Sequence, residues 1–397
     1  MTADPRDTID LREGRFARLE AIPWWDRDVL VSAKVLVIGA GALGNEVIKN
    51  LSLLGVGRLV VVDMDRIEES NLCRSVLFRE SDAGEAKAEI AVRAARNIYP
   101  RLQTTAIVGN VLADVGLGVF RWSDVVVGAV DNREARLFIN ASCARVGRPW
   151  IDGGIEALNG VVRGFAPPAT TCYECTLSEA DWKLIDQRRS CSLLARHAVS
   201  QSGEPTTPTT ASVIGAIQAQ EVVKRLHGLA ALDGTAYFFE GLHHNSYTVE
   251  YPRSPSCPWH ETQPPIEAPP ELDYRTPLRD VWSWAADRLE GLDAIDLSRE
   301  LVERFHCVQC GSESEVFASI EHGPVEAARC DKCGAERVPR FLHSVANDRP
   351  DLLGHSAAEL GLPPRDILWC RRGDEALGIE LAVAPSDDPL RELGASS

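Results

Sequence analysis

The chain has 397 residues, of which 45% are apolar and 25% charged, and its formal net charge is -16 at pH 7. This length suits two or three domains, and the apolar fraction suffices for a substantial core. The acidic balance argues against non-specific nucleic-acid binding and is compatible with a basic protein partner. No N-terminal apolar signal and no membrane-spanning apolar run is found, so we expect a cytoplasmic protein that binds neither nucleic acid nor membranes.

Strands and helices are predicted to alternate along the first part of the chain. The predicted strands cover 34–38, 58–63, 104–109 and 124–130, and the predicted helices cover 43–54, 85–98 and 133–146. This alternation is typical of an α/β fold with a mostly parallel, Rossmann-like sheet that binds ligands at the carboxyl ends of its strands. Strand-like runs at 160–165, 236–239 and 246–251 predict an antiparallel extension, which we expect to hold a small protein partner.

A glycine-rich turn follows the first predicted strand. Gly39 and Gly41 let the backbone turn tightly and approach a phosphate, and Gly44 lets the next helix pack closely on its strand. Asp63 ends the second predicted strand, where a carboxylate can accept hydrogen bonds from ribose hydroxyls. These four residues predict a nucleotide site, but they do not distinguish ATP from a dinucleotide.

Five further polar residues favour ATP. They are, in chain order, Asp65, Asn71, Arg74, Lys87 and Asp131. An arginine and a lysine beside the phosphates can neutralise charge on a pentavalent phosphorus and on a pyrophosphate leaving group, while a strand-end aspartate can hold Mg²⁺. A dehydrogenase has no need of this set, so the pattern predicts nucleotidyl transfer.

The ordered set resembles the adenylating domain of the ubiquitin-activating, ThiF and MoeB superfamily, over residues 12–262. The resemblance implies ATP and Mg²⁺ as cofactors, and a ubiquitin-like or sulfur-carrier protein with a C-terminal glycine as the partner. It also implies a homodimer in which Arg18 reaches the triphosphate bound by the other subunit. Arg12 and Arg15 lie close by and are alternatives for that role.

Two sets of metal ligands are predicted, each built from pairs with a two-residue gap that can clasp one Zn²⁺. The first set is Cys172, Cys175, Cys257 and His260, and the second is Cys307, Cys310, Cys330 and Cys333. The second has the spacing of a zinc ribbon. In the resembled family the first site usually has four cysteines, so His260 departs from the pattern. The alternative for Cys257 is an ordinary buried cysteine that binds no metal. Four protein ligands leave no position for water, so both zinc sites are expected to be structural.

Cys191 is the candidate nucleophile. It follows Arg188 and Arg189, whose charges can lower the pKa of a thiol, and precedes a threonine-rich approach to a predicted helix at 211–226. The resemblance places the thioester-forming cysteine of ubiquitin-like activating enzymes in this region. The alternative is an ordinary loop cysteine.

The rest of the chain lies beyond the resemblance. We predict an adenylation domain over 1–262, a proline- and glutamate-rich linker over 263–277, and a C-terminal domain over 278–397 that contains a helix at 278–304 and the zinc ribbon. This last domain is expected to dock the protein partner or the next enzyme.

The sequence therefore predicts an activating enzyme that adenylates the C-terminal glycine of a ubiquitin-like protein, forms a thioester on Cys191 and passes the protein to a conjugating enzyme. An alternative is a sulfur-carrier adenylyltransferase of the thiamine or molybdopterin type, which needs no thioester. A nicotinamide oxidoreductase would leave Asn71, Arg74, Lys87 and Asp131 unexplained. A non-catalytic scaffold held together by zinc is disfavoured because all the charged residues of the predicted ATP site are present.

Overall fold

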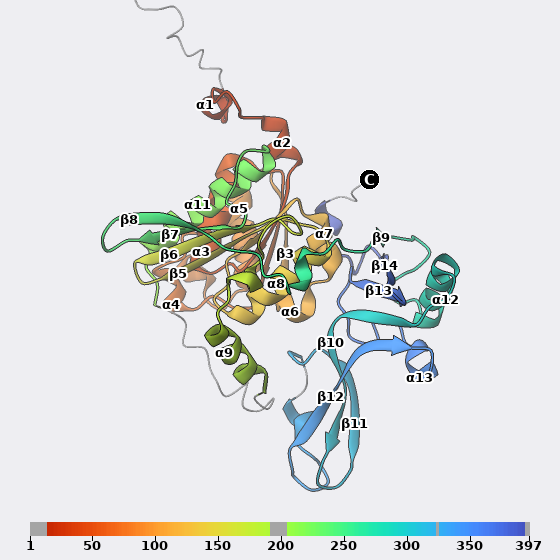
Figure 1. Cartoon of the computed structure of the whole chain (residues 1–397). Helices are drawn as coiled ribbons and strands as arrows, with labels where there is room; N and C mark the ends of the chain where they lie inside the picture. The colour runs from red at the N-terminus through yellow and green to blue at the C-terminus, as the bar shows by residue number, and fades with distance from the viewer. Residues whose placement is uncertain (1–13, 191–204, 323–324, 394–397) are drawn as a thin grey trace, which may run out of the picture.

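Two β-sheets organise the chain in the computed structural model, which describes residues 14–190, 205–322 and 325–393 (Figure 1). The first sheet has eight strands in the order β3-β2-β1-β4-β5-β6-β7-β8. The first five strands in this order, β3, β2, β1, β4 and β5, are parallel. Their bounds are β1 Lys34–Ile38, β2 Arg58–Asp63, β3 Gln103–Val108, β4 Val125–Gly128, β5 Trp150–Glu156, β6 Asn159–Phe165, β7 Thr235–Glu240 and β8 Asn245–Glu250. The last three are antiparallel additions, so the predicted fold class is confirmed.

Helices cover both faces of this sheet because its central strands are apolar on both sides. Val35 and Val37 of β1 face one core and Leu36 and Ile38 the other. The first face packs against α3 (Ala42–Leu54), α5 (Lys87–Ile98) and α11 (Pro208–Leu226), and the second against α6 (Val111–Asp114), α7 (Leu117–Trp122), α8 (Arg133–Arg145) and α9 (Glu179–Ser190). Three short helices, α1 (Ala17–Glu20), α2 (Arg27–Ser32) and α4 (Glu69–Leu72), complete this part.

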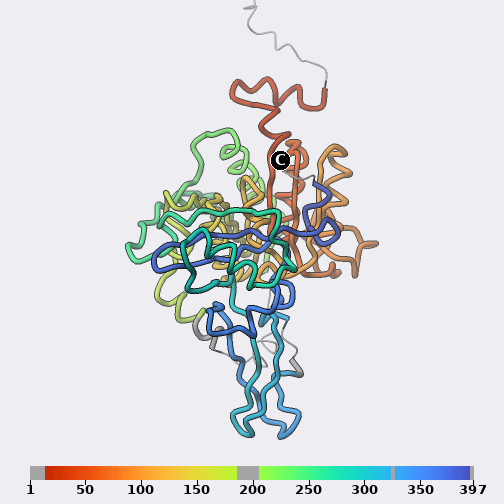
Figure 2. The backbone as a smooth tube through the Cα atoms, turned by 90° about the vertical axis from the view of Figure 1, so that its right-hand side faces the viewer, coloured from red at the N-terminus to blue at the C-terminus, as the bar shows by residue number. Residues whose placement is uncertain are grey.

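The second sheet lies in the C-terminal part. Its order is β11-β10-β13-β14-β9, with β12 also paired to β10. The bounds are β9 Ile266–Glu267, β10 Ala294–Cys307, β11 Glu313–Ala318, β12 Arg337–Ala346, β13 Ile367–Arg372 and β14 Glu375–Glu380, with helices α12 Leu278–Leu289 and α13 Pro350–Leu353. Strand β9, inside the segment predicted as a linker, pairs with β14. The far ends of β10, β11 and β12 form an arm that extends from the body of the molecule (Figure 2).

One predicted helix is wrong in its second half. Helix α12 ends at Leu289, where Glu290 adopts a left-handed backbone with φ of 53°, and residues 294–307 form β10 instead. The leucines at 297 and 301 have a spacing that also fits a helix, but β10 is paired with β12 and β13 in one half and with β11 and β12 in the other. This non-local pairing overrides the local pattern.

The C-terminal part packs directly on the first sheet's helices. Arg299 of β10 is buried between the two, and its guanidinium donates to the carbonyl oxygens of Leu112 and Val115, each at 2.8 Å. Asp366 accepts from the amide of Leu117 at the start of α7 at 3.1 Å. None of the helices in the described chain has the length and apolar character that crossing a membrane requires.

Candidate active site and metal centres

The glycine turn connects β1 to α3. Gly39 has φ of 97°, and a Cβ there would collide with the carbonyl oxygen of Ala129 at the end of β4. A Cβ on Gly44 would collide with the carbonyl oxygen of Gly39, so α3 packs against the turn at backbone contact. Gly41 instead faces open space and precedes the first residue of α3. The turn thus has a free backbone surface at a helix N-terminus, which suits a phosphate.

Asp63 holds this turn in place from the end of β2. Its carboxylate accepts from the amide of Ala40 at 2.6 Å and from the amide of Asp65 at 2.8 Å. Burial raises the pKa of Asp63, while these two amides and the charge of Lys87 act in the opposite direction. The predicted ribose carboxylate is therefore a fixed acceptor at the strand end.

Lys87 and Asp65 form an ion pair beside Asp63, with 2.7 Å between Nζ and Oδ2. The backbone amide of Lys87, at the start of α5, also donates to the carbonyl oxygen of Asp65 at 2.9 Å. Asn71 lies inside α4 and completes its capping box, because its side-chain oxygen accepts from the amide of the N-cap residue Glu68 at 3.1 Å. The structure thus brings the glycine turn, Asp63, Asp65 and Lys87 into one hydrogen-bonded unit.

The remaining predicted residues are placed less tightly. Arg74 is half-buried as a residue, and its guanidinium makes no ion pair or hydrogen bond within the described part of the chain. Asp131 is exposed just after β4, and its carboxylate accepts from Asn132 Nδ2 at 3.3 Å. Arg18 is exposed on α1. Cys191 lies outside the described residues.

Sequence reasoning missed a buried asparagine that supports the turn. Asn45 is fully buried on α3 and donates to the carbonyl oxygens of Ala40 at 2.7 Å and Gly41 at 3.1 Å. Its side-chain oxygen accepts from the amide of Leu77 at 2.8 Å, in the segment that follows Arg74. The only available signal was its place directly after Gly44, on a helix whose neighbouring residues are mostly apolar.

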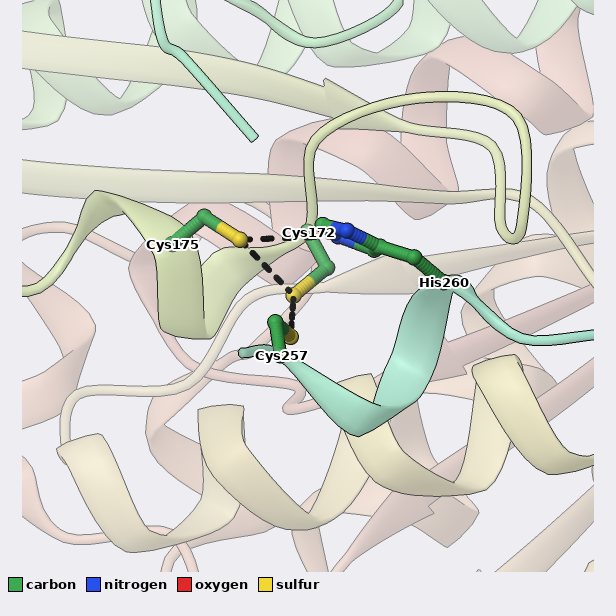
Figure 3. A group of neighbouring side chains, drawn as sticks. All are labelled: Cys172, Cys175, Cys257 and His260. Atoms are coloured by element: carbon green, nitrogen blue, oxygen red, sulfur yellow. Dashed lines mark hydrogen bonds between the residues drawn. The ribbon is translucent and has the colours of Figure 1, made fainter. Parts of the chain in front are cut away.

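The first predicted zinc set comes together although its halves are far apart in sequence (Figure 3). The Cys172 Sγ lies 3.8 Å from Cys175 Sγ and 3.4 Å from Cys257 Sγ, and Cys175 Sγ lies 3.4 Å from His260 Nε2. Zn–S bonds of about 2.3 Å place tetrahedral sulfurs about 3.8 Å apart, so the set fits Zn²⁺. Arg253 Nε lies 3.2 Å from His260 Nδ1. Ligation through Nε2 puts the proton of a neutral ring on Nδ1, so that contact has to change when a metal binds.

The second set lies at the end of the arm. Cys307 Sγ is 3.5 Å from Cys333 Sγ, and Cys310 Sγ is 3.5 Å from Cys330 Sγ. Each pair is followed by a glycine with positive φ, Gly311 at 71° and Gly334 at 72°, whose amide donates back to the first cysteine's carbonyl. The two cysteine pairs therefore have the same backbone geometry. Hydrogen bonding with Ser312 lowers the pKa of Cys330 to about 5, which favours a thiolate ligand. Each of the two clusters could hold one zinc ion.

The fold is α/β, and the glycine turn and Asp63 lie at the carboxyl ends of β1 and β2, where such folds bind ligands. A family model described as the ThiF family matches residues 15–259, and the chain belongs to that family. It is an enzyme of the E1-like adenylyltransferase class, which confirms the resemblance predicted from the sequence.

Characterised relatives agree with this assignment. The chain is 34% identical over 236 residues to the SAMP-activating enzyme E1 of Haloferax volcanii, covering 58% of this chain and 80% of that protein. It is 31% identical to the sulfur carrier protein adenylyltransferase of Thermus thermophilus, covering 58% and 82%. The match to the NEDD8-activating enzyme E1 catalytic subunit of Schizosaccharomyces pombe is 37% identical, but spans only 34% of that protein.

Solved structures agree on the fold. Escherichia coli MccB with ATP is similar with a TM-score of 0.52 and 24% identity, over 64% of this chain and 75% of that one. MccB in complex with N-formylated MccA gives a TM-score of 0.53 over 62% and 75%.

Proposed function

We propose that the chain transfers AMP from ATP to the carboxylate of the C-terminal glycine of a ubiquitin-like or sulfur-carrier protein. The observation that carries the proposal is the unit formed by the glycine turn, Asp63 and the Asp65–Lys87 pair, inside the segment that the ThiF family model matches. The unit offers a phosphate surface, a ribose acceptor and a cation within a few residues of one another.

In the proposed step, a carboxylate oxygen of the glycine attacks the α-phosphorus of ATP. The bond from that phosphorus to the oxygen bridging to the β-phosphate breaks, and pyrophosphate leaves with its electron pair. Lys87, Arg74 and Arg18 of a second subunit would offset the negative charge, each contributing about 2.7–4 kcal/mol in the transition state. Asp131 has the oxygen ligands and the exposure to hold Mg²⁺, which supplies further charge neutralisation when bound.

For the finer reaction we propose a thioester. The Cys191 thiolate would attack the carbonyl carbon of the acyl adenylate, AMP would leave, and the acyl group would pass to the cysteine of a conjugating enzyme. The names of the Haloferax and Schizosaccharomyces relatives support this route. The Thermus relative supports the alternative, in which the acyl adenylate is the product and no thioester forms.

The test uses the full-length protein with ATP, Mg²⁺ and small glycine-terminated proteins from the same genome. ATP–pyrophosphate exchange that depends on one of these proteins is expected, and it should nearly vanish in Lys87→Ala and Asp131→Ala. Wild-type exchange rates in either variant would refute the site assignment. The absence of exchange with every such protein would refute the adenylation proposal.

Non-reducing gels then separate the two routes. A thiol-sensitive adduct is expected that needs ATP, disappears in Cys191→Ala and persists in Cys73→Ala, which removes an exposed thiol elsewhere on the surface. Exchange without an adduct, unchanged in Cys191→Ala, would replace the thioester route by the sulfur-carrier route.

A further inference from the structure

A buried charged cluster lies behind the loop that carries Asp131. Asp152 of β5 is fully buried, and its two carboxylate oxygens are each bound by a different arginine. Arg136 Nε on α8 donates to Oδ1 at 2.8 Å, and Arg163 Nη1 on β6 donates to Oδ2 at 2.6 Å. A fully buried carboxylate with two guanidinium partners has a fixed orientation, and so do the arginines that it binds.

Arg136 uses its remaining donors on the backbone. Its Nη2 donates to the carbonyl oxygen of Val130 at 2.6 Å and to that of Gly153 at 3.1 Å. Val130 is the residue directly before Asp131, so Arg136 ties the segment that follows β4 to the neighbouring β5. Arg163 belongs to the same cluster but donates to neither of these carbonyls.

Apart from the electrostatic attraction of Arg136, the Asp131 carboxylate has little direct support. Its hydrogen bond from Asn132 Nδ2 is 3.3 Å long, and the side-chain oxygen of Asn132 is occupied in capping α8 through the amide of Ala135. The orientation of the exposed carboxylate therefore depends on the backbone of residues 130–132, which Arg136 holds from the buried side.

We propose that Arg136, oriented by Asp152, is a positioning residue that fixes the Asp131 carboxylate for the divalent cation bound with the nucleotide. The inference rests on the proposed function, in which Asp131 is a ligand of Mg²⁺. Arg136 is not a ligand of the cation; it acts through the Val130 carbonyl, and its charge also attracts the Asp131 carboxylate. Loss of a group that orients a metal ligand typically lowers metal affinity by about 10- to 100-fold.

The experiment measures binding rather than turnover, with the non-hydrolysable α,β-methylene analogue of ATP and with Mn²⁺ as a paramagnetic probe. Calorimetry gives the nucleotide Kd with and without metal, and the resonance of free Mn²⁺ gives the metal Kd. In Arg136→Gln, Mn²⁺ affinity is expected to fall about 10- to 100-fold, with the metal-free nucleotide Kd unchanged. Arg136→Lys keeps the charge but has a single amine, and is expected to show an intermediate loss.

Arg163→Gln is the matched control, because it also removes one partner of Asp152. It is expected to lower the melting temperature while leaving Mn²⁺ affinity within about twofold of wild type. Wild-type Mn²⁺ affinity in Arg136→Gln, or an equal loss in Arg163→Gln, would overturn the positioning role. If Arg136→Gln does not fold, Arg136→Lys with wild-type affinity overturns it equally. Failure of the wild-type protein to bind the analogue at all would instead count against the proposed function.

Discussion

Replacing Arg299 by methionine is expected to destabilise the whole chain, because this arginine joins the C-terminal sheet to the segment around α6 and α7 that packs on the first sheet. Its side chain is only 5% exposed, and its guanidinium lies 5.1 Å from the ring centre of Phe138 on α8. It donates to the carbonyl oxygens of Leu112 and Val115 and lies 3.6 Å from the Asp366 carboxylate. Methionine fills much of the same volume but donates no hydrogen bond.

The size of the effect follows from what the substitution leaves behind. The carbonyl oxygens of Leu112 and Val115 lose a charged donor, and such a loss typically costs about 1–3 kcal/mol for each buried group. Asp366 also loses one of its cations but keeps the charge of Arg145 and donors from the Leu117 amide and the Ser298 hydroxyl. Because the carboxylate keeps these two donors, the expected loss comes mainly from the two carbonyl oxygens and is about 2–6 kcal/mol.

Guanidinium denaturation followed by the fluorescence of the nine tryptophans measures this loss. Arg371→Met is the control, since Arg371 forms an ion pair with Asp296 at 2.9 Å on the exposed side of the same sheet. That variant is expected to cost no more than about 1 kcal/mol. A loss below 1 kcal/mol in Arg299→Met, or equal losses in the two variants, would refute the view that the buried arginine couples the two parts.

Three smaller predictions concern the turn and the metal centres. Gly39→Ala is expected to lose both stability and ATP binding. Gly41→Ala, whose Cβ meets open space, should keep the wild-type melting temperature and lose only ATP affinity in calorimetry. Equal losses of stability in the two variants would contradict this. Asn45→Ala leaves the Leu77 amide without its acceptor and should cost about 1–3 kcal/mol in urea unfolding. Mass spectrometry of the native protein should find two zinc ions in the wild type and one zinc ion in each of Cys172→Ser and Cys310→Ser. A variant that still binds two zinc ions would exclude the cluster it alters as a zinc site.

The sequence predicted the structure best where residues close together in the chain determine it. Strands β1, β2 and β4 are short apolar runs that end at, or directly before, a glycine or an aspartate, and the βα alternation predicts that they are parallel. The cysteine ligands could be predicted equally well, because two cysteines separated by two residues can bind the same ion.

Contacts between distant segments could not be read in this way. Strand β10 has leucines whose spacing fits a helix, and only pairing with β11, β12 and β13 makes it a strand. Asn45 and Arg136 both donate to backbone carbonyl oxygens, and the residue types in the sequence do not reveal such partners. These groups shape the site through contacts that no spacing rule describes.

The proposed nucleotide site has a fixed half and a free half. Asp63 and the Asp65–Lys87 pair are already bonded to the backbone or to each other, so binding a nucleoside to them requires little reordering. Arg74 makes no such bond within the described residues, and ordering a long side chain costs up to about 2 kcal/mol. On the proposed function, that cost is best offset where negative charge is greatest, during phosphoryl transfer rather than in the ground state. The fixed residues would then recognise the nucleotide, while the free arginine would act mainly on the rate of adenylation.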